Sequence, residues 1–372
     1  MALPDVKLKV GEKVADKFTV KKKLGEGSCG QVLLVSDLNN NLLAMKIEAR
    51  MKSKEDEILK MEIYVLKKLQ NSKNVCRFIQ SGTSQLAGGF TYCVMTLLGP
   101  DLSDLRRRCP NRKMQASSVL RFAIQAVQAV EDMHTAGFIH RDVKPTNMSV
   151  GHKLKHTLYL FDFGLARQIK LPDSNGKLKL RDPRKKVAFR GTVRYCSLNV
   201  HLCKEQGMHD DLYGVLYSMI ELATSTLPWK GCMRKEAEKI KTATTAKTLL
   251  QGAPKSLATF LELIQGLTYT SVPNYNKIKA ALIVELKGMK VTMTTPFEWE
   301  KSTASSMAAP IKETTKDAQG PEMDKGPDND TNKDVDENAE SVCSDVSKPG
   351  GSGKDFDIEN TLENINEPKT ED

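Results

Sequence analysis

The order of apolar and polar positions in the first hundred residues predicts several strands around a single helix. Residues 18–24 alternate enough to form a strand, and residues 32–35 continue as a second strand after three glycines. Residues 43–47 and 92–95 are short apolar runs of the kind that form buried strands. Between them, the apolar positions of residues 55–66 recur near helical spacing, which predicts a helix with one apolar face.

Further along the chain, the pattern favours a helical region and then a polar tail. Residues 117–136 are predicted to form one long apolar helix, and residues 158–161 a short apolar strand. Residues 301–372 have few apolar positions and no periodicity, so they cannot bury enough surface to offset their chain entropy. We expect this tail to be disordered, with residues 356–365 able to form a helix on a partner.

One stretch between these elements contains the candidate catalytic and metal-binding residues. Residues 140–147 have the sequence His-Arg-Asp-Val-Lys-Pro-Thr-Asn, and Asp162-Phe-Gly follows the last apolar strand. Asp142 can accept the proton of a substrate hydroxyl, and Lys144 can steady a transferring phosphate. Asn147 and Asp162 supply oxygen ligands, which magnesium prefers. The run matches the catalytic-loop signature of protein kinases and predicts phosphoryl transfer.

The glycines between the first two strands suit a nucleotide. Gly25, Gly27 and Gly30 let the backbone approach a triphosphate and point amides at it. A dinucleotide-binding fold would continue as a helix, whereas this chain continues as a strand, which favours a kinase glycine-rich loop; a plain hairpin turn is the simpler alternative. Lys46 lies within an apolar strand and is costly there unless paired, and Glu62 on the predicted helix is its natural partner.

Residues 92–100 suit an interlobe hinge whose backbone meets adenine. Met95 would flank the adenine pocket as gatekeeper, and a core methionine is the equally good alternative. The residues expected to contact ATP are Leu24, Gly25, Glu26, Gly27, Ser28, Cys29, Gly30, Val32, Ala44, Lys46, Glu62, Met95 and Leu98.

Charge is unevenly distributed along the 372 residues, whose net charge is +10. Residues 301–372 hold 8 lysines against 18 acidic residues, a net charge of −10, so residues 1–300 carry +20. A basic body suits nucleic acid, anionic membranes or acidic substrates. No segment resembles an RNA-binding surface with interleaved aromatic residues or a zinc finger, so nucleic acid is the less favoured partner.

The eight cysteines are scattered without a C-x-x-C pair, which predicts reduced thiols. The first residues resemble neither a signal peptide nor a myristoylation site, and no apolar run approaches membrane-spanning length. We therefore expect a soluble protein of the cytoplasm, the nucleus or both, with no membrane association.

A strongly basic stretch lies between Asp162 and Thr192. Its basic residues are Arg167, Lys170, Lys177, Lys179, Arg181, Arg184, Lys185, Lys186 and Arg190. A solvated loop is the usual fate of such a run, and attraction of an anionic substrate is an equal alternative. A nuclear-localisation patch at residues 181–186 is a weaker third.

Residues 189–199, Phe-Arg-Gly-Thr-Val-Arg-Tyr-Cys-Ser-Leu-Asn, are similar to one kinase group. Most kinases end this segment with Ala-Pro-Glu, whereas the Ser-Leu-Asn of this chain resembles the Ser-Ile-Asn of the casein kinase 1 group. With His209-Asp-Asp-Leu, Leu227-Pro-Trp and Phe297-Glu-Trp-Glu, the chain looks most like the tau-tubulin kinase branch. The likeness covers roughly residues 15–300 and rests on several motifs in the family order.

The resemblance implies an α+β, bilobal protein-kinase fold with ATP between the lobes. The kinase domain would span residues 18–300. An N-terminal lobe of five antiparallel strands and one helix would occupy about residues 18–95, and a mainly helical C-terminal lobe about residues 99–300. Residues 1–17 would be a short N-terminal extension, and residues 301–372 the disordered acidic tail.

The resemblance also implies roles for single residues. Lys144, two positions after Asp142, marks serine/threonine kinases, and Thr192 would help to position the substrate hydroxyl. Asp211 would anchor the catalytic loop from the helix below it. Gly214 replaces the serine usual in that helix, at a cost of up to about 1 kcal/mol relative to alanine.

A pocket for an anion beside the activation segment is a further implication. Arg194 and Gly231 match two of its positions, while its lysine is either Lys239 or Lys241. Because arginine binds phosphate through two nitrogens, such a pocket suits acidic or already phosphorylated substrates.

These features predict a serine/threonine protein kinase that uses ATP and Mg²⁺, acts on protein substrates and works as a monomer. A pseudokinase, or a scaffold that acts through the kinase fold and a tail-binding partner, is the alternative from another class. The presence of Lys46, Glu62, Asp142, Asn147 and Asp162 argues against a loss of catalysis.

Overall fold

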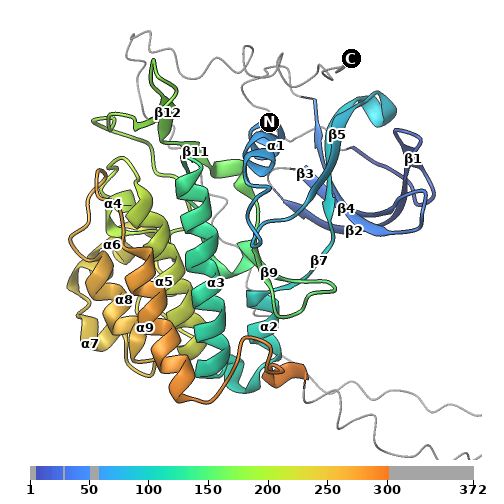
Figure 1. Ribbon diagram of the computed structural model, residues 1–372. Coiled ribbons are helices and arrows are strands. Elements are labelled where there is room, and N and C mark those ends of the chain that lie inside the picture. The colour runs from blue at the N-terminus through green and yellow to red at the C-terminus, as the bar shows by residue number, and fades with distance from the viewer. Residues whose placement is uncertain (1–5, 28–29, 51–57, 301–372) are drawn as a thin grey trace, which may run out of the picture. The chain divides into compact units, whose positions relative to one another are not determined.

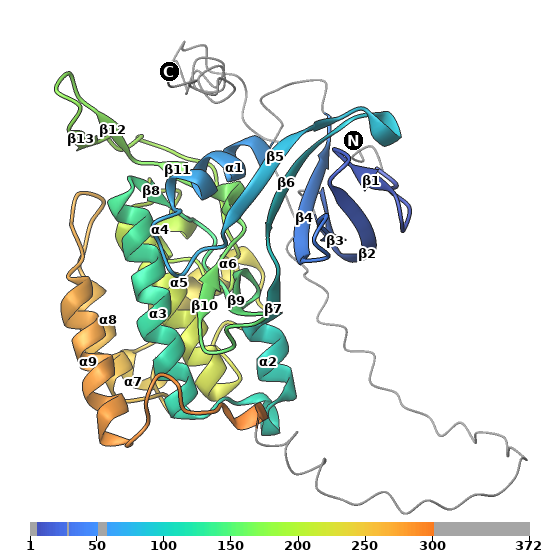
Figure 2. The same ribbon diagram turned by 45° about the vertical axis from the view of Figure 1, so that its right-hand side comes forward.

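The computed structural model describes residues 6–27, 30–50 and 58–300. The expectations for Ser28, Cys29, the start of the first predicted helix and the acidic tail lie outside the described residues. Within them, a sheet with one helix is followed by a mainly helical lobe (Figures 1 and 2), which confirms the predicted bilobal fold.

The N-terminal lobe is built on one antiparallel sheet. Its strands in spatial order are β1 (Lys13–Val14), β2 (Phe18–Gly27), β3 (Gly30–Ser36), β4 (Leu42–Ala49), β6 (Phe90–Thr96) and β5 (Phe78–Ser84). The described residues thus give six strands where five were expected. The extra strand is β1, because Val6 and Val14 are buried against Phe18 on the same face of the sheet. Burial of each valine is worth about 1.5–3 kcal/mol, enough to hold a short edge strand.

Helix α1 (Ile58–Lys68) is tied to β4 by two alternate side chains of that strand. The carboxylate of Glu48 accepts hydrogen bonds from the backbone N–H groups of Ile58 and Leu59, at 3.1 and 3.0 Å. A negative charge at a helix N-terminus satisfies donors that have no partner within the helix. Lys46, two residues before Glu48, points to the same face because strand side chains alternate.

The C-terminal lobe is mainly helical. Its helices are α2 (Leu102–Arg108), α3 (Ala116–Thr135), α4 (Leu198–His201), α5 (Met208–Thr224), α6 (Arg234–Ala243), α7 (Ala246–Leu249), α8 (Ser256–Ile264) and α9 (Tyr275–Gly288). Helix α3 packs against α5 and α9, and α8 packs against the same two helices. No helix within the described ranges is long and apolar enough to cross a membrane.

Short strands connect the helices. They are β7 (Leu98–Asp101), β8 (Phe138–Ile139), β9 (Met148–Gly151), β10 (Leu158–Leu160), β11 (Arg167–Gln168), β12 (Lys170–Pro172) and β13 (Leu178–Leu180). Strands β7, β9 and β10 form one small sheet, β8 pairs with β11, and β12 pairs with β13. The β12–β13 hairpin projects from the body (Figures 1 and 2), so part of the basic stretch is a hairpin.

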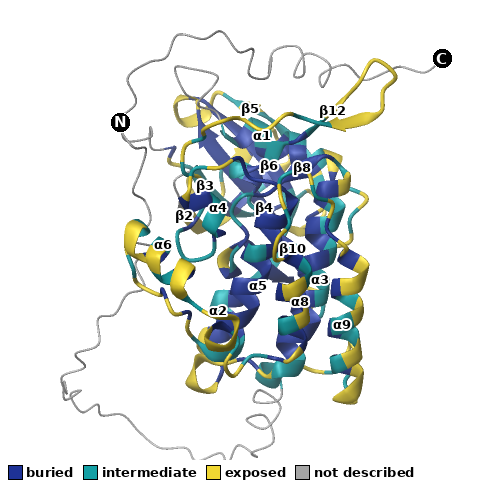
Figure 3. Ribbon diagram, turned by 90° about the vertical axis from the view of Figure 1, so that its left-hand side faces the viewer, coloured by how far each residue is buried: buried dark blue, intermediate teal, exposed yellow. Residues whose placement is uncertain are grey.

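Burial differs sharply between the helices of this lobe (Figure 3). Helix α5 is buried along most of its length, whereas α9 buries only Tyr275, Ile278, Leu282 and Leu286. Those four positions follow the spacing of one helical face, which is what a helix on the outside of a core requires. Helix α5 is therefore the central element on which the catalytic loop can rest.

The end of the described chain closes the base of this lobe. The fully buried ring of Phe297 stacks on Phe122 of α3, with ring centroids 4.9 Å apart. The carboxylate of Glu298 accepts hydrogen bonds from the Gln115 N–H, at 2.9 Å, and from the Ser118 hydroxyl. The chain thus caps the start of α3, whose first N–H groups otherwise have no partner.

Candidate active site

The glycine-rich turn joins β2 to β3. Gly25 pairs with Val32 and Gly27 with Gly30 across the hairpin. Gly30 has a φ of 110°, and a Cβ atom there would lie 2.1 Å from the carbonyl oxygen of Ile47, so only glycine fits. A Cβ on Gly25 would meet nothing within 4 Å, which leaves open space beside that part of the turn.

The residues expected around adenine come from neighbouring strands. Ala44 on β4 pairs with Met95 on β6, and Val32 on β3 pairs with Lys46. Ala44 is buried, Val32 and Met95 are partly exposed, and the expected contacts Leu24 and Glu26 are exposed on β2. Leu98 begins β7, which already belongs to a sheet of the C-terminal lobe. The chain passes between the lobes at the point where a hinge was expected.

Lys46 connects three segments. Its Nζ lies 2.5 Å from Oε2 of Glu62 on α1 and 3.1 Å from Oδ1 of Asp162. Burial raises the pKa of Glu62, and the charge of Lys46 opposes that shift. Burial also acts to raise the pKa of Asp162, but the charge and hydrogen bond of Lys46, with His140 and Lys144, hold it below its ordinary value. Asp162 is therefore anionic at neutral pH, as a magnesium ligand requires.

Asp211 on α5 holds the backbone of the catalytic loop. Its two carboxylate oxygens accept hydrogen bonds from the N–H groups of His140 and Arg141, at 2.7 and 2.8 Å, and from the ring of His134 at 2.9 Å. Arg141 has a φ of 68°, which is strained for a residue with a side chain. The hydrogen bonds of Asp211 stabilise that strained turn, and they hold the pKa of Asp211 below its usual value although burial opposes them.

Four expected catalytic side chains meet beyond that turn. The hydroxyl of Thr192 donates to Oδ1 of Asp142 at 2.7 Å, and Lys144 Nζ lies 3.1 Å from both the Thr192 hydroxyl and Oδ2 of Asp142. Asn147 Nδ2 donates to the carbonyl oxygen of Asp142 at 2.9 Å. A base, a cation and a hydroxyl are thereby held within hydrogen-bonding distance of one another, an arrangement that orients Asp142 as a candidate general base.

Two glycines allow the segments that carry this network to approach one another closely. A Cβ on Gly191, whose φ is 115°, would lie 2.5 Å from the carbonyl oxygen of Arg141. A Cβ on Gly214 in α5 would lie 2.8 Å from the carbonyl oxygen of Val143. Gly214 therefore permits close contact between α5 and the catalytic loop, a role beyond the propensity cost inferred from its position in a helix.

Part of the basic stretch is neutralised inside the protein. The buried carboxylate of Glu205 binds Arg184 Nε at 2.6 Å and Arg167 Nε at 3.5 Å. Burial, with the nearby charges of Arg167, Arg190 and Arg184, lowers the pKa of Arg141 to about 10. Glu205 thus offsets a cluster of arginines around the catalytic loop, so these charges are not simply solvated.

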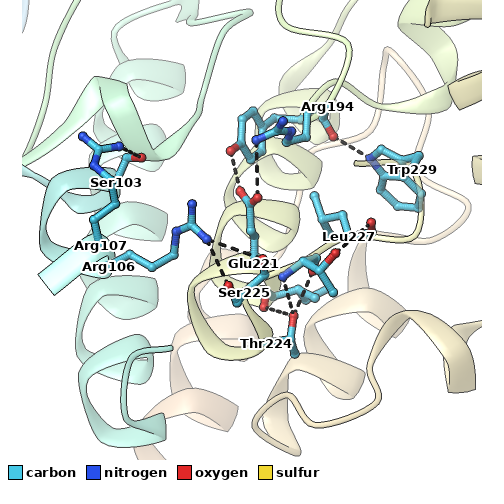
Figure 4. A network of polar contacts seen from close by, with 12 residues as sticks. Ser103, Arg106, Arg107, Arg194, Glu221, Thr224, Ser225, Leu227 and Trp229 are labelled. Atoms are coloured by element: carbon cyan, nitrogen blue, oxygen red, sulfur yellow. Dashed lines mark hydrogen bonds and ion pairs between the residues drawn. The ribbon is translucent and has the colours of Figure 1, made fainter. Parts of the chain in front are cut away.

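Two of the cations considered for the expected anion pocket have partners inside the protein. Arg194 Nη1 lies 3.5 Å from Oε1 of Glu221, a fully buried residue of α5 (Figure 4). Lys241 is buried and donates to the carbonyl oxygens of Val193 and Cys196, at 2.7 and 2.6 Å. Burial lowers its pKa to about 8.

The two remaining pocket positions lie at the surface. Gly231 has a φ of 79° with nothing within 4 Å of an added Cβ, and Lys239 is exposed on α6. Of the two candidate lysines, Lys239 is the one whose side chain reaches solvent, whereas Lys241 supports the backbone of the segment that carries Arg194.

The oxygen atoms available near Lys46 fit magnesium rather than a metal that prefers nitrogen or sulfur. The side chain of Asp162 is 37% exposed. Asn147 uses its amide nitrogen to bind Asp142, which leaves its amide oxygen as an acceptor. No group of three or more His, Cys, Asp or Glu side chains suited to a metal occurs in the described part of the chain. Magnesium fits such a site, because it usually takes one or two protein ligands together with phosphate oxygens.

Two carboxylates of the site were missed by sequence reasoning. Glu221 interrupts the apolar run of α5, so a buried charge in need of a partner was a usable signal. Glu205 lies in no periodic element and had no comparable signal. Its importance depends on arginines that approach it from other segments.

Comparisons with known proteins agree with this geometry. A model of the protein kinase domain matches residues 18–279. The chain is 35% identical over 299 residues to a probable serine/threonine-protein kinase of Dictyostelium discoideum, covering 79% of this chain and 59% of that protein. It is 31% identical over 296 residues to serine/threonine-protein kinase spe-6 of Caenorhabditis elegans, covering 77% and 76%. It is 30% identical over 295 residues to casein kinase I homolog 1 of Saccharomyces cerevisiae, covering 76% and 53%. The chain thus spans less than two thirds of the first and third of these relatives.

Proposed function

This chain belongs to the protein kinase family, and from that premise we propose that it transfers the γ-phosphate of ATP to serine and threonine hydroxyls of proteins. One observation carries the proposal, the convergence of two networks from distant segments. Lys46 meets Asp162 from 116 positions away, and Asp142 meets Thr192 from 50 positions away. A chain that only needed a stable fold would have no reason to gather these charged groups.

The first network suits the nucleotide. Lys46 would contact the α and β phosphates, and Glu62 holds Lys46 in place. Asn147 and Asp162 would hold Mg²⁺, which neutralises charge on the phosphates when it is bound. Because Lys46 also binds Asp162, the phosphate contact and the metal site are positioned by one another.

The second network suits the protein substrate. Asp142 would accept the proton of the attacking hydroxyl, and its carboxylate is already oriented by Thr192 and Asn147. Lys144 would place a positive charge beside the transferred phosphoryl group. The lysine at this position supports a preference for serine and threonine, as the resemblance implies.

The test is radiolabel transfer from ATP with Mg²⁺ to casein and to peptides. We expect wild-type protein to label them and Asp162→Asn to lose transfer by about 100-fold or more, because one removed electrostatic contact typically costs that much. Asp173→Asn is the matched control, since the carboxylate of Asp173 accepts hydrogen bonds from the backbone N–H groups of Asn175 and Lys177 in the hairpin turn and takes part in neither network.

The outcomes separate the alternatives. Nucleotide binding without transfer by the wild type would identify a pseudokinase, and equal loss in both variants would point to a folding defect. Absence of nucleotide binding by folded protein would contradict the proposal altogether. Comparing the full chain with residues 1–300 tests whether the acidic tail inhibits transfer or recruits a partner.

The proposal extends to the casein kinase 1 group, with closest likeness to the tau-tubulin kinases, and to acidic or phosphorylated substrates. The Ser197-Leu198-Asn199 motif supports the group, and the partly exposed Arg194 supports an anion pocket. Loss of acidic-peptide preference in Arg194→Ala, with unchanged activity on neutral peptides, is the expected result. An unchanged preference would remove the pocket from the proposal.

A further inference from the structure

A buried carboxylate joins two stretches of the activation segment (residues 162–199). Glu205 lies in the loop between α4 and α5 and is 7% exposed. Arg184 donates from Nε to its Oε2 at 2.6 Å and from Nη2 to its Oε1 at 3.2 Å, which is a two-point contact. Arg167 Nε lies 3.5 Å from the same Oε1. Arg167 precedes the β12–β13 hairpin and Arg184 follows it, so Glu205 holds the chain on both sides of the hairpin.

The next residue, Gln206, extends this hold toward the catalytic loop. Its Nε2 donates to the carbonyl oxygen of Arg190 at 3.0 Å. Arg190 lies two positions before Thr192, whose hydroxyl donates to Asp142 at 2.7 Å. The contacts of Glu205 and Gln206 thus fix the stretch of chain that brings Thr192 to the catalytic aspartate.

Glu205 is the negative charge in a cluster of arginines. Burial lowers the pKa of Arg141 in the catalytic loop, and so do three nearby cations, those of Arg167, Arg190 and Arg184. The charge of Glu205 acts on Arg141 in the opposite direction. Burial also acts to raise the pKa of Glu205, but the hydrogen bond from Arg184 and the charge of Arg167 hold it below its ordinary value. Glu205 is therefore anionic at neutral pH, and its removal would leave like charges facing one another.

The activation segment offers few places for an added charge that could do the same. A phosphoryl group can order such a segment by pairing with arginines. Residues 163–191 of this chain contain one hydroxyl side chain, that of Ser174. Ser174 is exposed in the turn of the β12–β13 hairpin, which projects from the body (Figures 1 and 2). The next hydroxyl, that of Thr192, already donates to Asp142.

We infer that Glu205 is a positioning residue that supplies, from within the chain, the anion that holds the activation segment in its substrate-binding conformation. Phosphoryl transfer then needs no phosphate added to that segment. The inference rests on the proposed kinase function and adds a regulatory property to it. Glu205 acts through Arg184, Arg167 and the backbone, and it touches neither ATP nor the acceptor hydroxyl.

The first experiment removes the charge and keeps the shape. Glu205→Gln should lower kcat/KM for a peptide substrate at least about tenfold, because the charge-assisted contacts of the arginines are lost. The KM for ATP should stay unchanged, since the Lys46–Glu62 pair belongs to the other network. Glu285→Gln is the matched control. Glu285 is also a carboxylate that holds a loop, through the N–H groups of Lys255 and Ser256, but it lies on α9, so its peptide kcat/KM should not change.

The second experiment replaces the missing anion. Glu205→Ala opens space beside the arginines, and sodium sulfate should raise its peptide kcat/KM at least about threefold over sodium chloride of equal ionic strength. Arg184→Gln lacks the main cation and should not respond. Sulfate also stabilises folded proteins in general, and Glu285→Ala in the same salts measures that effect. A carboxylate with a purely structural role would give no sulfate response beyond that of Glu285→Ala.

The third measurement treats wild-type protein with a phosphatase, which should leave its peptide kcat/KM unchanged. A loss of activity on this treatment would overturn the inference. So would an unchanged peptide kcat/KM in Glu205→Gln, or a sulfate response in Glu205→Ala no larger than in Glu285→Ala. If the Glu205 variants do not fold, Arg184→Gln decides, because the side chain of Arg184 is 40% exposed and its loss should also lower peptide kcat/KM. Absence of transfer by the wild type would instead contradict the proposed function.

Discussion

Replacing Gly191 by alanine should separate the positioning of the catalytic-site Thr192 from the stability of the fold. Gly191 precedes Thr192 and has a φ of 115°, and a Cβ atom would lie 2.5 Å from the carbonyl oxygen of Arg141. That oxygen belongs to the strained turn held by Asp211, so the backbone has little freedom to retreat.

The magnitude follows from two costs. A left-handed backbone costs a residue with a Cβ about 1–2 kcal/mol. An overpacked contact costs about 1–3 kcal/mol more. The second cost can be relieved if residues 191 and 192 move away, which would break the 2.7 Å hydrogen bond from Thr192 to Asp142. Since a displacement of about 1 Å can lower a catalytic rate about 100-fold, we expect kcat to fall by that order.

Gly176→Ala is the matched control, because Gly176 also has a positive φ, 75°, but an added Cβ meets nothing within 4 Å. It should lose about 1 kcal/mol of stability and keep its kcat. Urea denaturation and initial rates at saturating ATP measure the two quantities. The reasoning is refuted if both variants lose kcat alike, or if Gly191→Ala keeps the wild-type rate.

Three further predictions concern charges and the end of the domain. Asp211→Asn should lose about 3 kcal/mol and most activity, because the N–H groups of His140 and Arg141 lose a charged acceptor; urea denaturation and rate assays measure both. Folding lowers the pKa of Glu205, since its arginine partners outweigh the opposing effect of burial. Its stabilisation is therefore complete above the ordinary carboxyl pKa of about 4.3 and is lost as the pH falls through the folded-state pKa. Wild type and Glu205→Gln should differ in stability at pH 7 and converge on acidification; a constant difference would contradict this. Shortening the fragment of residues 1–300 to residues 1–296 should lower its free energy of unfolding by at least about 3 kcal/mol, because Phe297 is fully buried. Calorimetry of the two fragments measures this difference, and equal stability would show that Phe297 is dispensable.

Much of this architecture is local in origin and was therefore predictable from the sequence. The apolar periodicity of residues 117–136 predicted a helix that the structure places at Ala116–Thr135, because helical hydrogen bonds join residues four apart. The octet from His140 to Asn147 contains its base, cation and amide within eight consecutive residues. Lys46 and Glu62 were paired by a simple rule, that a charge in an apolar strand needs a partner.

Other features required the tertiary structure. Strand β1 forms because Val14 finds an apolar face of the sheet, which its two-residue length could not predict. Gly214 looked like a helix defect until its contact with Val143 was known. Lys241 was one of two pocket candidates, and the fold turns it toward backbone carbonyls.

The sequence by itself determined which chemical groups are present and which neighbours along the chain share an element. The tertiary structure decided which distant groups meet, and so which charges are neutralised. Arg194 and Glu221 are 27 positions apart along the chain but in contact in the fold. Arg167 and Glu205 likewise come from different segments and form an ion pair. Electrostatic energy depends on the distance between charges in space and on their burial, and the order of residues along the chain gives neither quantity directly.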